Sequence, residues 1–277
     1  MALTLKEMNQ LVLELVGLET MSEDSGIVYD AENVIKKILA GVDMDTSMLI
    51  LAKQLGFDAV VQHHPAGVLN PHTSELFGRD HMNLMIECGV PINLAQKLAY
   101  KNNDVRKRTM HTRNRTQMRD VAKLLGISNA AYHTPTDMLA TRTVQAKMNA
   151  LMEKNPRCTI QEVIDELLTI REYAEALEGQ KPEVWVGSKE SFAGKVFVCM
   201  HGVGAFSADE YNACSDAGIG TFIGMHATPE VIEGVKKHGK SNLIIAGHMA
   251  SDSVGFNQLL DAWAKKGIEV VRISGIT

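Results

Sequence analysis

The chain has 277 residues, of which 45% are hydrophobic and 22% are charged. This composition excludes a chain that is disordered as its main state, because the hydrophobic fraction is large enough to form a buried core. The formal net charge of −5 provides no overall positive field, so nucleic-acid binding is not expected. The length fits one large α/β domain or two small lobes that share a core.

Cysteine spacing and hydrophobic runs bear on location. The four cysteines match no CxxC metal or redox motif. Three of them lie in hydrophobic segments, which favours buried free thiols and a reducing compartment. No hydrophobic run approaches the roughly 18 residues of a membrane helix, and the first residues lack the pattern of a signal peptide. We therefore expect a cytoplasmic protein with no membrane contact.

The first part of the chain alternates between helix and strand patterns. Thr4 is expected to cap a helix that runs to about residue 18, with hydrophobic residues on one face. A strand at 35–42, a helix at 46–54 and a strand at 58–62 follow. Strand–helix–strand is the repeating unit of parallel sheets, which predicts such a sheet here.

The middle of the chain is helical. Residues 74–125 have a helical pattern in which Pro91 begins a new helix. Further helices are expected at 135–151 and at 159–178, the second capped by Thr159. A short strand at 184–186 lies in the loop region that follows.

Strands and helices alternate again towards the C-terminus. We predict an α/β fold class, with two related α/β lobes, a largely parallel or mixed sheet and a helical middle segment. The expected division of this single unit is lobe one at about 1–135, a helical connection at 136–190 and lobe two at 191–277. The elements predicted for the last part are strands at 195–200, 219–223, 242–246 and 269–273, and helices at 207–217, 228–238 and 251–266.

Four predicted strands run directly into histidine, at His63 with His64, at His201, at His226 and at His248. Ligands bind beyond the carboxyl ends of parallel strands, and imidazole is a common metal ligand. A single histidine there is more often a hydrogen-bonded loop residue, so His201 and His226 are only additional candidates. The pair His63–His64 is the stronger signal, because neighbouring side chains diverge and can serve two metals, or one metal and a substrate.

In two places an aspartate follows a histidine by four residues. If a helix begins near His248, Asp252 lies on the same side and both can bind one divalent ion. The alternative is that Asp252 only stabilises the helix N-terminus by its charge. His133 and Asp137 have the same spacing across Pro135, which suits a loop that enters a helix. There the alternative is an ordinary capping turn.

Several of these segments together resemble the NIF-three-like family. Residues 43–46 and 56–65, DMDT and GFDAVVQHHP, resemble a family pattern of a strand ending in DVT, a helix, and then GADLIITHHP. Residues 246–252, AGHMASD, resemble the family's GH…SE element. Residues 201–204 stand where the family has a GSG-like turn. The resemblance spans both predicted lobes and about half of the chain.

The resemblance implies a site for two divalent metals at the junction of two related lobes, and a ring-shaped homo-oligomer that is often a hexamer. It implies that His63, His64 and His248 are metal ligands. Asp252 stands where the family has a glutamate ligand, which has a longer side chain. Family members are often described as GTP cyclohydrolase 1 type 2 homologues.

The family also has an HTNLD element whose aspartate binds metal. Its nearest match is HTPTD at 133–137, which makes Asp137 a metal ligand and His133 an additional candidate. This match follows residues 124–127, LLGI, whereas the usual family order places the element before them.

Two further features concern anions. Residues 202–207 follow a strand and precede a helix, the setting of a phosphate-binding turn. The third glycine of a dinucleotide motif is missing, so the turn accepts a substrate phosphate or is simply a tight turn that requires glycine. Residues 101–119 contain seven basic residues and one aspartate. This segment is a solvated helix face, a guide for an anionic substrate, or a nucleic-acid contact, although it lacks interleaved aromatic residues.

The leading hypothesis is a metal-dependent hydrolase with two divalent ions, Zn²⁺, Mn²⁺ or Fe²⁺. The ions would activate water against a nucleotide or another small molecule of phosphate-ester type. No protein nucleophile is assigned, because the metal-activated water is the reacting group. Asp43 is expected to orient a ligand. The alternative hypothesis is a non-enzymatic, metal-binding adaptor or regulatory protein that works through its oligomer.

Overall fold

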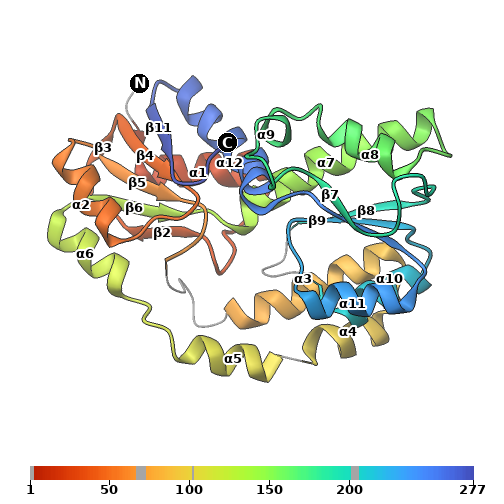
Figure 1. Ribbon diagram of the computed structural model, residues 1–277. Coiled ribbons are helices and arrows are strands. Elements are labelled where there is room, and N and C mark those ends of the chain that lie inside the picture. The colour runs from red at the N-terminus through yellow and green to blue at the C-terminus, as the bar shows by residue number, and fades with distance from the viewer. Residues whose placement is uncertain (1–2, 67–72, 102, 201–205) are drawn as a thin grey trace. The chain divides into compact units, whose positions relative to one another are not determined.

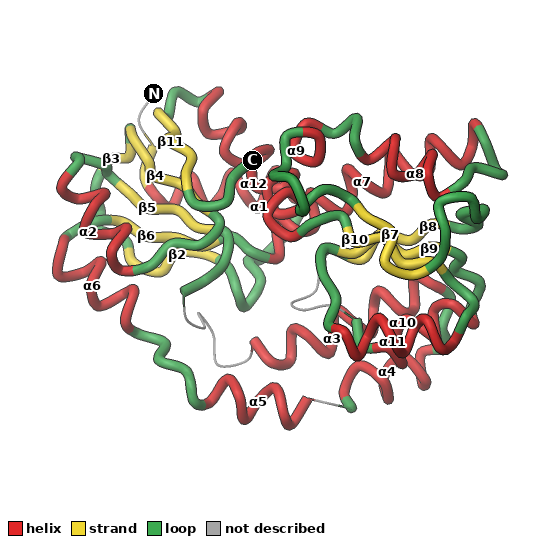
Figure 2. The backbone as a smooth tube through the Cα atoms, viewed as in Figure 1, coloured by secondary structure: helices red, strands yellow, loops and turns green. Residues whose placement is uncertain are grey.

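The computed structural model describes residues 3–66, 73–101, 103–200 and 206–277, which form two compact units (Figure 1). The first unit contains residues 1–74, 107–139 and 255–276, and the second contains residues 75–106, 140–254 and 277. Each unit has its own main sheet, drawn in yellow in Figure 2. Apart from the last residue, the chain passes between the units inside four helices, which are α3 (Thr73–Cys88), α5 (Asn103–His111), α7 (Thr134–Lys154) and α12 (His248–Lys265).

The first unit is built on a five-stranded sheet. Four neighbouring strands are parallel, and the fifth is an antiparallel strand at one edge. A separate two-stranded ladder pairs β1 (Leu3–Thr4) with β3 (Val34–Ile35). In spatial order the strands of the main sheet are β11 (Glu269–Ile273), β4 (Lys37–Gly41), β5 (Ala59–Gln62), β6 (Ser128–Ala131) and β2 (Gly26–Tyr29).

Helices cover both faces of this sheet. Along β5, Ala59 and Val61 belong to a core with α1 (Leu5–Val16) and the part of α12 from residue 256 onwards. Val60 points to the opposite face and belongs to a core with α2 (Thr46–Gln54) and α6 (Gln117–Leu125). Side chains alternate along a pleated strand, so a strand buried on both faces must be hydrophobic throughout.

The second unit has a four-stranded sheet covered in the same way. Its order is β7 (Glu183–Val186), β10 (Asn242–Ile245), β9 (Thr221–Gly224) and β8 (Val196–Cys199). The last three strands are parallel and β7 is antiparallel. One face packs against α7, α8 (Ile160–Leu167) and α9 (Arg171–Ala174). The other packs against α3, α4 (Ile92–Tyr100), α10 (Ala208–Asp216) and α11 (Pro229–His238).

Local sequence signals begin the helices where they were predicted. Thr4 forms a capping box with Glu7 at the start of α1, so two backbone N–H groups that lack helical partners are satisfied. Thr159 does the same at α8, and Ser207 at α10. The helix predicted at 46–54 is α2, with the same bounds.

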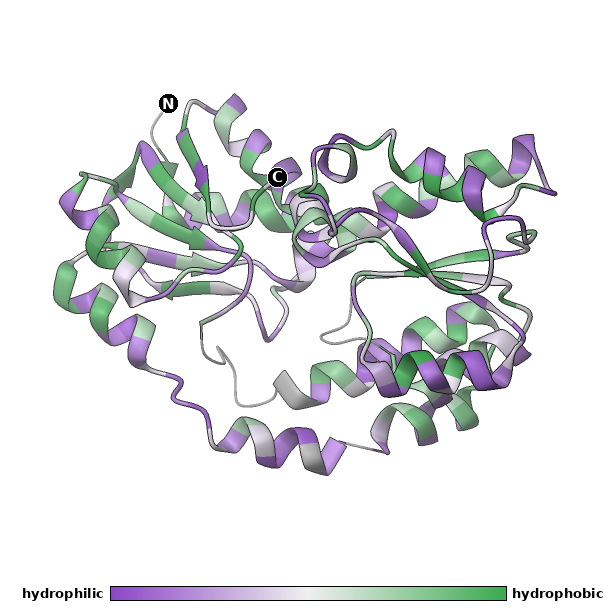
Figure 3. Ribbon diagram, in the orientation of Figure 1, coloured by the Kyte–Doolittle hydropathy of each residue, from purple (hydrophilic) through white to green (hydrophobic). Residues whose placement is uncertain are grey.

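The basic segment at 101–119 forms α5 and the approach to α6, and α5 is largely hydrophilic in Figure 3. In the second unit Lys101 donates to Asp209 over 2.8 Å. Within the described residues, no helix combines the length and the hydropathy that crossing a membrane requires.

The α/β prediction is confirmed, including the helical middle segment. Three strands of the described residues were not predicted, namely β1, β2 and β6, and the strand predicted at 35–42 is divided into β3 and β4. β1 has only two residues, and β6 has the sequence SNAA, which lacks the β-branched and aromatic residues that mark strands. The helix predicted to start at Ser251 starts at His248.

The predicted lobe boundaries are wrong. Residues 255–276 were assigned to lobe two, but β11 pairs in parallel with β4 in the first sheet. Residues 75–106 were assigned to lobe one, but α4 packs in a core of the second unit. Alternating βα patterns do not reveal which sheet a strand joins, because pairing partners are far apart in sequence.

Gln62, the last residue of β5, is fully buried, and its side-chain nitrogen and oxygen have no hydrogen-bond partner in the structure. Burying an amide without hydrogen bonds is costly. Gln62→Met, which keeps the shape, is therefore expected to raise the free energy of unfolding by about 1–2 kcal/mol. Urea denaturation of the metal-free protein measures this. The exposed Gln54→Met is the control, and a less stable Gln62 variant contradicts the expectation.

Candidate metal centre

The centre lies in the first unit, at the carboxyl ends of β5 and β6. His63 and His64 follow β5 directly, and their backbone N–H groups donate to Gly41 and Val42, over 3.1 and 3.0 Å. His133 lies two residues beyond β6, just before α7. The sheet hydrogen bonds thus continue past the last strand residue of β5 and hold these histidines on rigid backbone.

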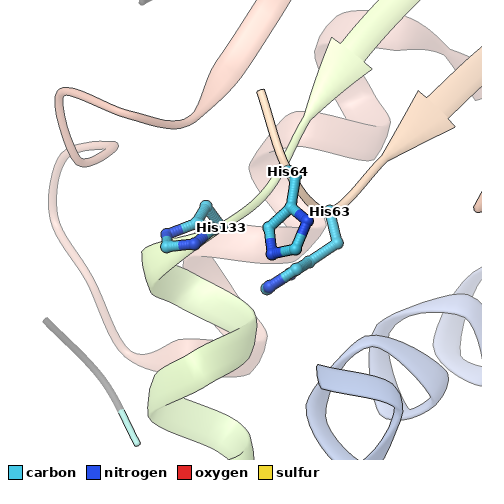
Figure 4. A group of neighbouring side chains, drawn as sticks. All are labelled: His63, His64 and His133. Carbon is cyan, nitrogen blue, oxygen red and sulfur yellow. The ribbon is translucent and has the colours of Figure 1, made fainter. Parts of the chain in front are cut away.

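The three imidazole rings lie together (Figure 4). The ring centroids of His63 and His133 are 4.7 Å apart, and the rings are stacked. His64 lies 4.8 Å from His63 and 5.5 Å from His133 by the same measure. One ring nitrogen from each residue lies within 4.8 Å of the other two. The three nitrogens are therefore close enough to bind one metal ion.

Hydrogen bonding determines which nitrogen of His63 carries the proton. Its Nδ1 lies 2.8 Å from the hydroxyl oxygen of Thr136. That hydroxyl donates its only proton to the backbone carbonyl of Tyr132, over 2.6 Å. The Thr136 oxygen must therefore accept from His63 Nδ1–H, which places the lone pair of the ring on Nε2.

His64 and His133 have the same tautomer for a simpler reason. Nδ1 of His64 lies 2.8 Å from Oδ1 of Asp43, and Nδ1 of His133 lies 2.9 Å from Oδ2 of Asp24. Ionised carboxylates only accept hydrogen bonds, so both Nδ1 atoms donate. In proteins, histidines that bind metal usually donate their second nitrogen to such a partner. The predicted orienting role of Asp43 is consistent with this contact.

Asp137 supplies a carboxylate to the same group. It is 3% exposed, and its Oδ1 lies 3.4 Å from Nε2 of His63. Its Oδ2 lies 3.6 Å from Nδ1 of His133. Nε2 and a carboxylate oxygen are both acceptors, so they repel at this distance unless a cation lies between them or His63 gains a second proton. Neutral imidazoles with one carboxylate are a donor set that suits Zn²⁺, Mn²⁺ or Fe²⁺, so these residues fit a divalent metal.

Asp24 connects several parts of this centre. Its Oδ2 accepts from His133 and from the hydroxyl of Thr134, and its Oδ1 accepts from Ser22 and Ser25. Burial raises the pKa of Asp24, but the hydrogen bond from His133, the positive charge that this ring carries when it is protonated in the metal-free protein, and the hydroxyl hydrogen bonds outweigh burial and hold the pKa at about 2. Asp24 therefore remains a carboxylate and keeps the His133 ring oriented.

The second unit contains another histidine and aspartate pair. Because α12 begins at His248, Asp252 lies one turn further along the helix, and its Oδ2 is 3.5 Å from His248 Nε2. Asp252 is 1% exposed. The ring of His226, after β9, packs edge-on against His248, with centroids 4.7 Å apart.

A hydrogen-bond chain holds the start of α12 beside this pair. Tyr173 donates its hydroxyl proton to Ser251, since the Ser251 hydroxyl donates to the backbone carbonyl of Gly247.

Comparison with solved structures places these features in a family. A NIF3 superfamily protein from Sphaerobacter thermophilus matches with a TM-score of 0.92 and 32% identity, over 99% of this chain and 100% of that one. The chain belongs to the NIF3 superfamily. Protein ybgI, described as of unknown function, matches at TM-score 0.58 and 18% identity, over 98% of each chain. Reduced HcgD from Methanocaldococcus jannaschii matches at 0.58 and 11%, also over 98% of each. These two share the fold alone.

No protein-family model and no curated protein matches the sequence. The family prediction made from the strand-end histidines is nevertheless confirmed by the Sphaerobacter structure. In this NIF3 fold the histidines of the HHP segment lie at the carboxyl end of β5.

The predicted site residues are distributed over both units of this NIF3 protein. His63, His64 and Asp137 come together in the first unit, and His133, predicted only as an additional candidate, joins them. His248, Asp252 and His226 lie in the second unit. His201 and the glycine turn at 202–205 lie outside the described residues.

Sequence reasoning missed Asp24 and Thr136, which orient His133 and His63. Asp24 stands 109 residues before its partner His133 and lies in a polar loop without a motif. Thr136 stands inside the HTPTD segment, so the spacing of that segment offered a signal. The HTPTD segment therefore contains both candidate metal ligands and the Thr136 hydroxyl that orients His63.

Proposed function

We propose that this NIF3 protein is a metal-dependent hydrolase that acts on a nucleotide or another small molecule of phosphate-ester type. The observation that carries the proposal is the orientation of three histidines. His63, His64 and His133 each donate Nδ1–H to a fixed partner, so each presents its Nε2 lone pair. This is the arrangement of ligands in protein metal sites.

In the first unit, His63, His64, His133 and Asp137 would bind a divalent ion. In the second unit, His248 and Asp252 would bind a divalent ion through the one-turn spacing of α12, and His226 is an additional ligand candidate. The proposal is therefore two divalent ions, one for each of these ligand sets, of Zn²⁺, Mn²⁺ or Fe²⁺. Mixed nitrogen and oxygen donors do not discriminate sharply among these metals.

The residues of this chain have separate parts in the chemistry. A bound divalent ion lowers the pKa of water and polarises a phosphoryl or carbonyl oxygen. Thr136, Asp43 and Asp24 hold the three imidazoles in one tautomer and one orientation. Asp137 supplies negative charge in a buried position, which strengthens the attraction for a cation. A reaction of the GTP cyclohydrolase type is also a hydrolysis by activated water, so it belongs to the same class.

The experiment is the metal content of tag-free protein, measured by inductively coupled plasma mass spectrometry. We expect about one to two equivalents of a transition metal in the wild type, as mononuclear or dinuclear hydrolases hold. His64→Ala and His248→Ala should each lower the content. His238→Ala is the matched control, because His238 pairs with Asp216 on the surface. Nucleotides and phosphate esters are then screened with the metal that is found.

Two outcomes would redirect the proposal. A wild type without metal, even after incubation with Zn²⁺, Mn²⁺ or Fe²⁺, contradicts both the centre and the hydrolase. Metal that is present and lost in both variants, without turnover of any phosphate ester, supports a non-enzymatic metal-binding adaptor instead. If His238→Ala also lost its metal, the losses in the other variants would be explained by lower stability of the fold and not by removal of a metal ligand.

Self-association into a ring-shaped homo-oligomer, a hexamer, is part of the same proposal. Large hydrophobic side chains with high exposed fractions support it, namely Leu124 at 86%, Leu177 at 71% and Phe192 at 66%. Light scattering after size exclusion should then give about six times the 30.4 kDa chain mass, and a monomer mass contradicts it. A cytoplasmic location is also proposed, supported by four cysteines that are all free thiols.

A further inference from the structure

The first unit contains a cavity of about 420 Å³ that the metal centre does not include. Its walls come from the segment 21–28, which leads into β2, and from Arg115 and Arg119 at the start of α6. The volume is within the range of small-molecule sites. The cavity lies at the edge of the sheet where β2 begins, and α6 directs the positive end of its helix dipole to the same place.

Arg115 lines the cavity with its charged side chain. It is half-buried, and among the residues that the structure describes it forms no ion pair and no hydrogen bond. Arg119 lines the same cavity and makes one loose contact, 3.5 Å to Asp120. Arg115 and Arg119 bring two positive charges to the cavity walls and Glu23 brings one negative charge, so the lining has an excess of positive charge that favours an anion. The planar donor pairs of the two guanidinium groups match phosphate oxygens.

The other residues that line the cavity indicate which chemical groups the ligand carries besides its phosphate. Ser22 and Ser25 donate their hydroxyl protons to Oδ1 of Asp24, over 2.8 and 2.9 Å. Both hydroxyls can therefore only accept from a ligand, so the ligand must carry hydroxyl or amino donors. Met21, Ile27 and Val28 add a hydrophobic wall that suits a carbon skeleton. Inorganic phosphate alone would leave these walls unused.

Asp24 links this cavity to the metal centre. One of its oxygens accepts from the two cavity serines, and the other accepts from His133 and Thr134. The backbone N–H of His133 also donates to the Ser25 hydroxyl, over 3.0 Å. A ligand in the cavity is thus separated from a metal ligand by a single residue.

We propose that this cavity binds the phosphate group and the adjoining hydroxyl groups of a small sugar-phosphate-like monoester, with Arg115 and Arg119 as the anion-binding residues. This deepens the proposed function and rests on it, since the cavity would anchor the phosphate of the substrate while a different hydrolysable bond of the same molecule lies at the metal centre. Anion binding by the cavity itself does not require the metal.

The test uses metal-free full-length protein and calorimetric titration with ribose 5-phosphate, with ribose as the uncharged comparison. Arg115→Ala should weaken ribose 5-phosphate binding by about tenfold or more. Arg113→Ala is the matched control, because Arg113 is an exposed arginine of the same segment that does not line the cavity. Glu23→Gln should tighten binding, because it removes a cavity carboxylate of the same sign as the ligand.

The outcomes separate this inference from the metal proposal. Ribose 5-phosphate that binds the wild type and His64→Ala equally, but not Arg115→Ala, supports the cavity whatever the metal content. No binding to the wild type at millimolar concentration overturns the inference. Equal weakening by Arg113→Ala and Arg115→Ala also overturns it, because it would show a general charge effect. Circular dichroism of Arg115→Ala is the control for correct folding, and a folded variant that binds as the wild type does also overturns the inference.

Discussion

Asp137→Asn is expected to stabilise the metal-free protein and to abolish most of its metal affinity. Oδ1 of Asp137 faces the Nε2 of His63 at 3.4 Å, and both are acceptors in the tautomer that Thr136 imposes. An asparagine amide can donate to that nitrogen, which should raise the free energy of unfolding by about 1 kcal/mol. The same change removes a charged ligand, and the affinity should fall at least about 100-fold.

The expected result is specific to this site, because the stability of the metal-free protein should rise while its metal affinity falls. Thermal unfolding is measured with excess chelator and with added metal, and the metal affinity by competition with a fluorescent chelator. Asp216→Asn, at a surface ion pair, controls for the loss of one negative charge. If the metal-free Asp137→Asn protein were less stable than the wild type, His63 would carry two protons and form an ion pair with Asp137 instead.

Asp24→Asn is expected to lower metal affinity by about 10–100-fold, although Asp24 is not a ligand. Asparagine can still bond to its four neighbours, but it no longer determines that His133 donates through Nδ1. The His133 ring then has two orientations of similar energy, and only one presents Nε2. Asp43→Asn should have a similar but smaller effect through His64, because Asp43 is exposed and its hydrogen bond is in competition with water.

The same variant should change the acid stability of the metal-free protein. The pKa of Asp24 is lowered from 3.8 to about 2, which corresponds to about 2 kcal/mol of stability. Because the pKa is lower in the folded state, this contribution is complete above about pH 4 and is lost as the pH falls towards 2. Unfolding free energies from pH 6 to pH 2 should therefore converge for the wild type and Asp24→Asn. A constant difference over that range contradicts the role of Asp24.

Some features followed directly from local sequence. The first helix and α8 begin at threonine capping boxes, and α2 has its predicted bounds, because capping depends on residues three positions apart. The histidines of the HHP segment are at a strand end because a hydrophobic run stops there. The one-turn spacing of His248 and Asp252 needed only the knowledge that a helix begins at His248.

The tertiary structure alone decided the rest. The last strand returns to the first sheet, and β6, which positions His133, has no strand-like sequence. Asp24 meets His133 across 109 residues, and Arg115 lines the same cavity as Ser22 and Ser25 only because α6 packs beside β2. Capping and periodicity are short-range, so the sequence by itself determined where elements begin and which residue types end the strands. Sheet order and edge pairing result from burial of the whole chain, and they determined which polar groups meet.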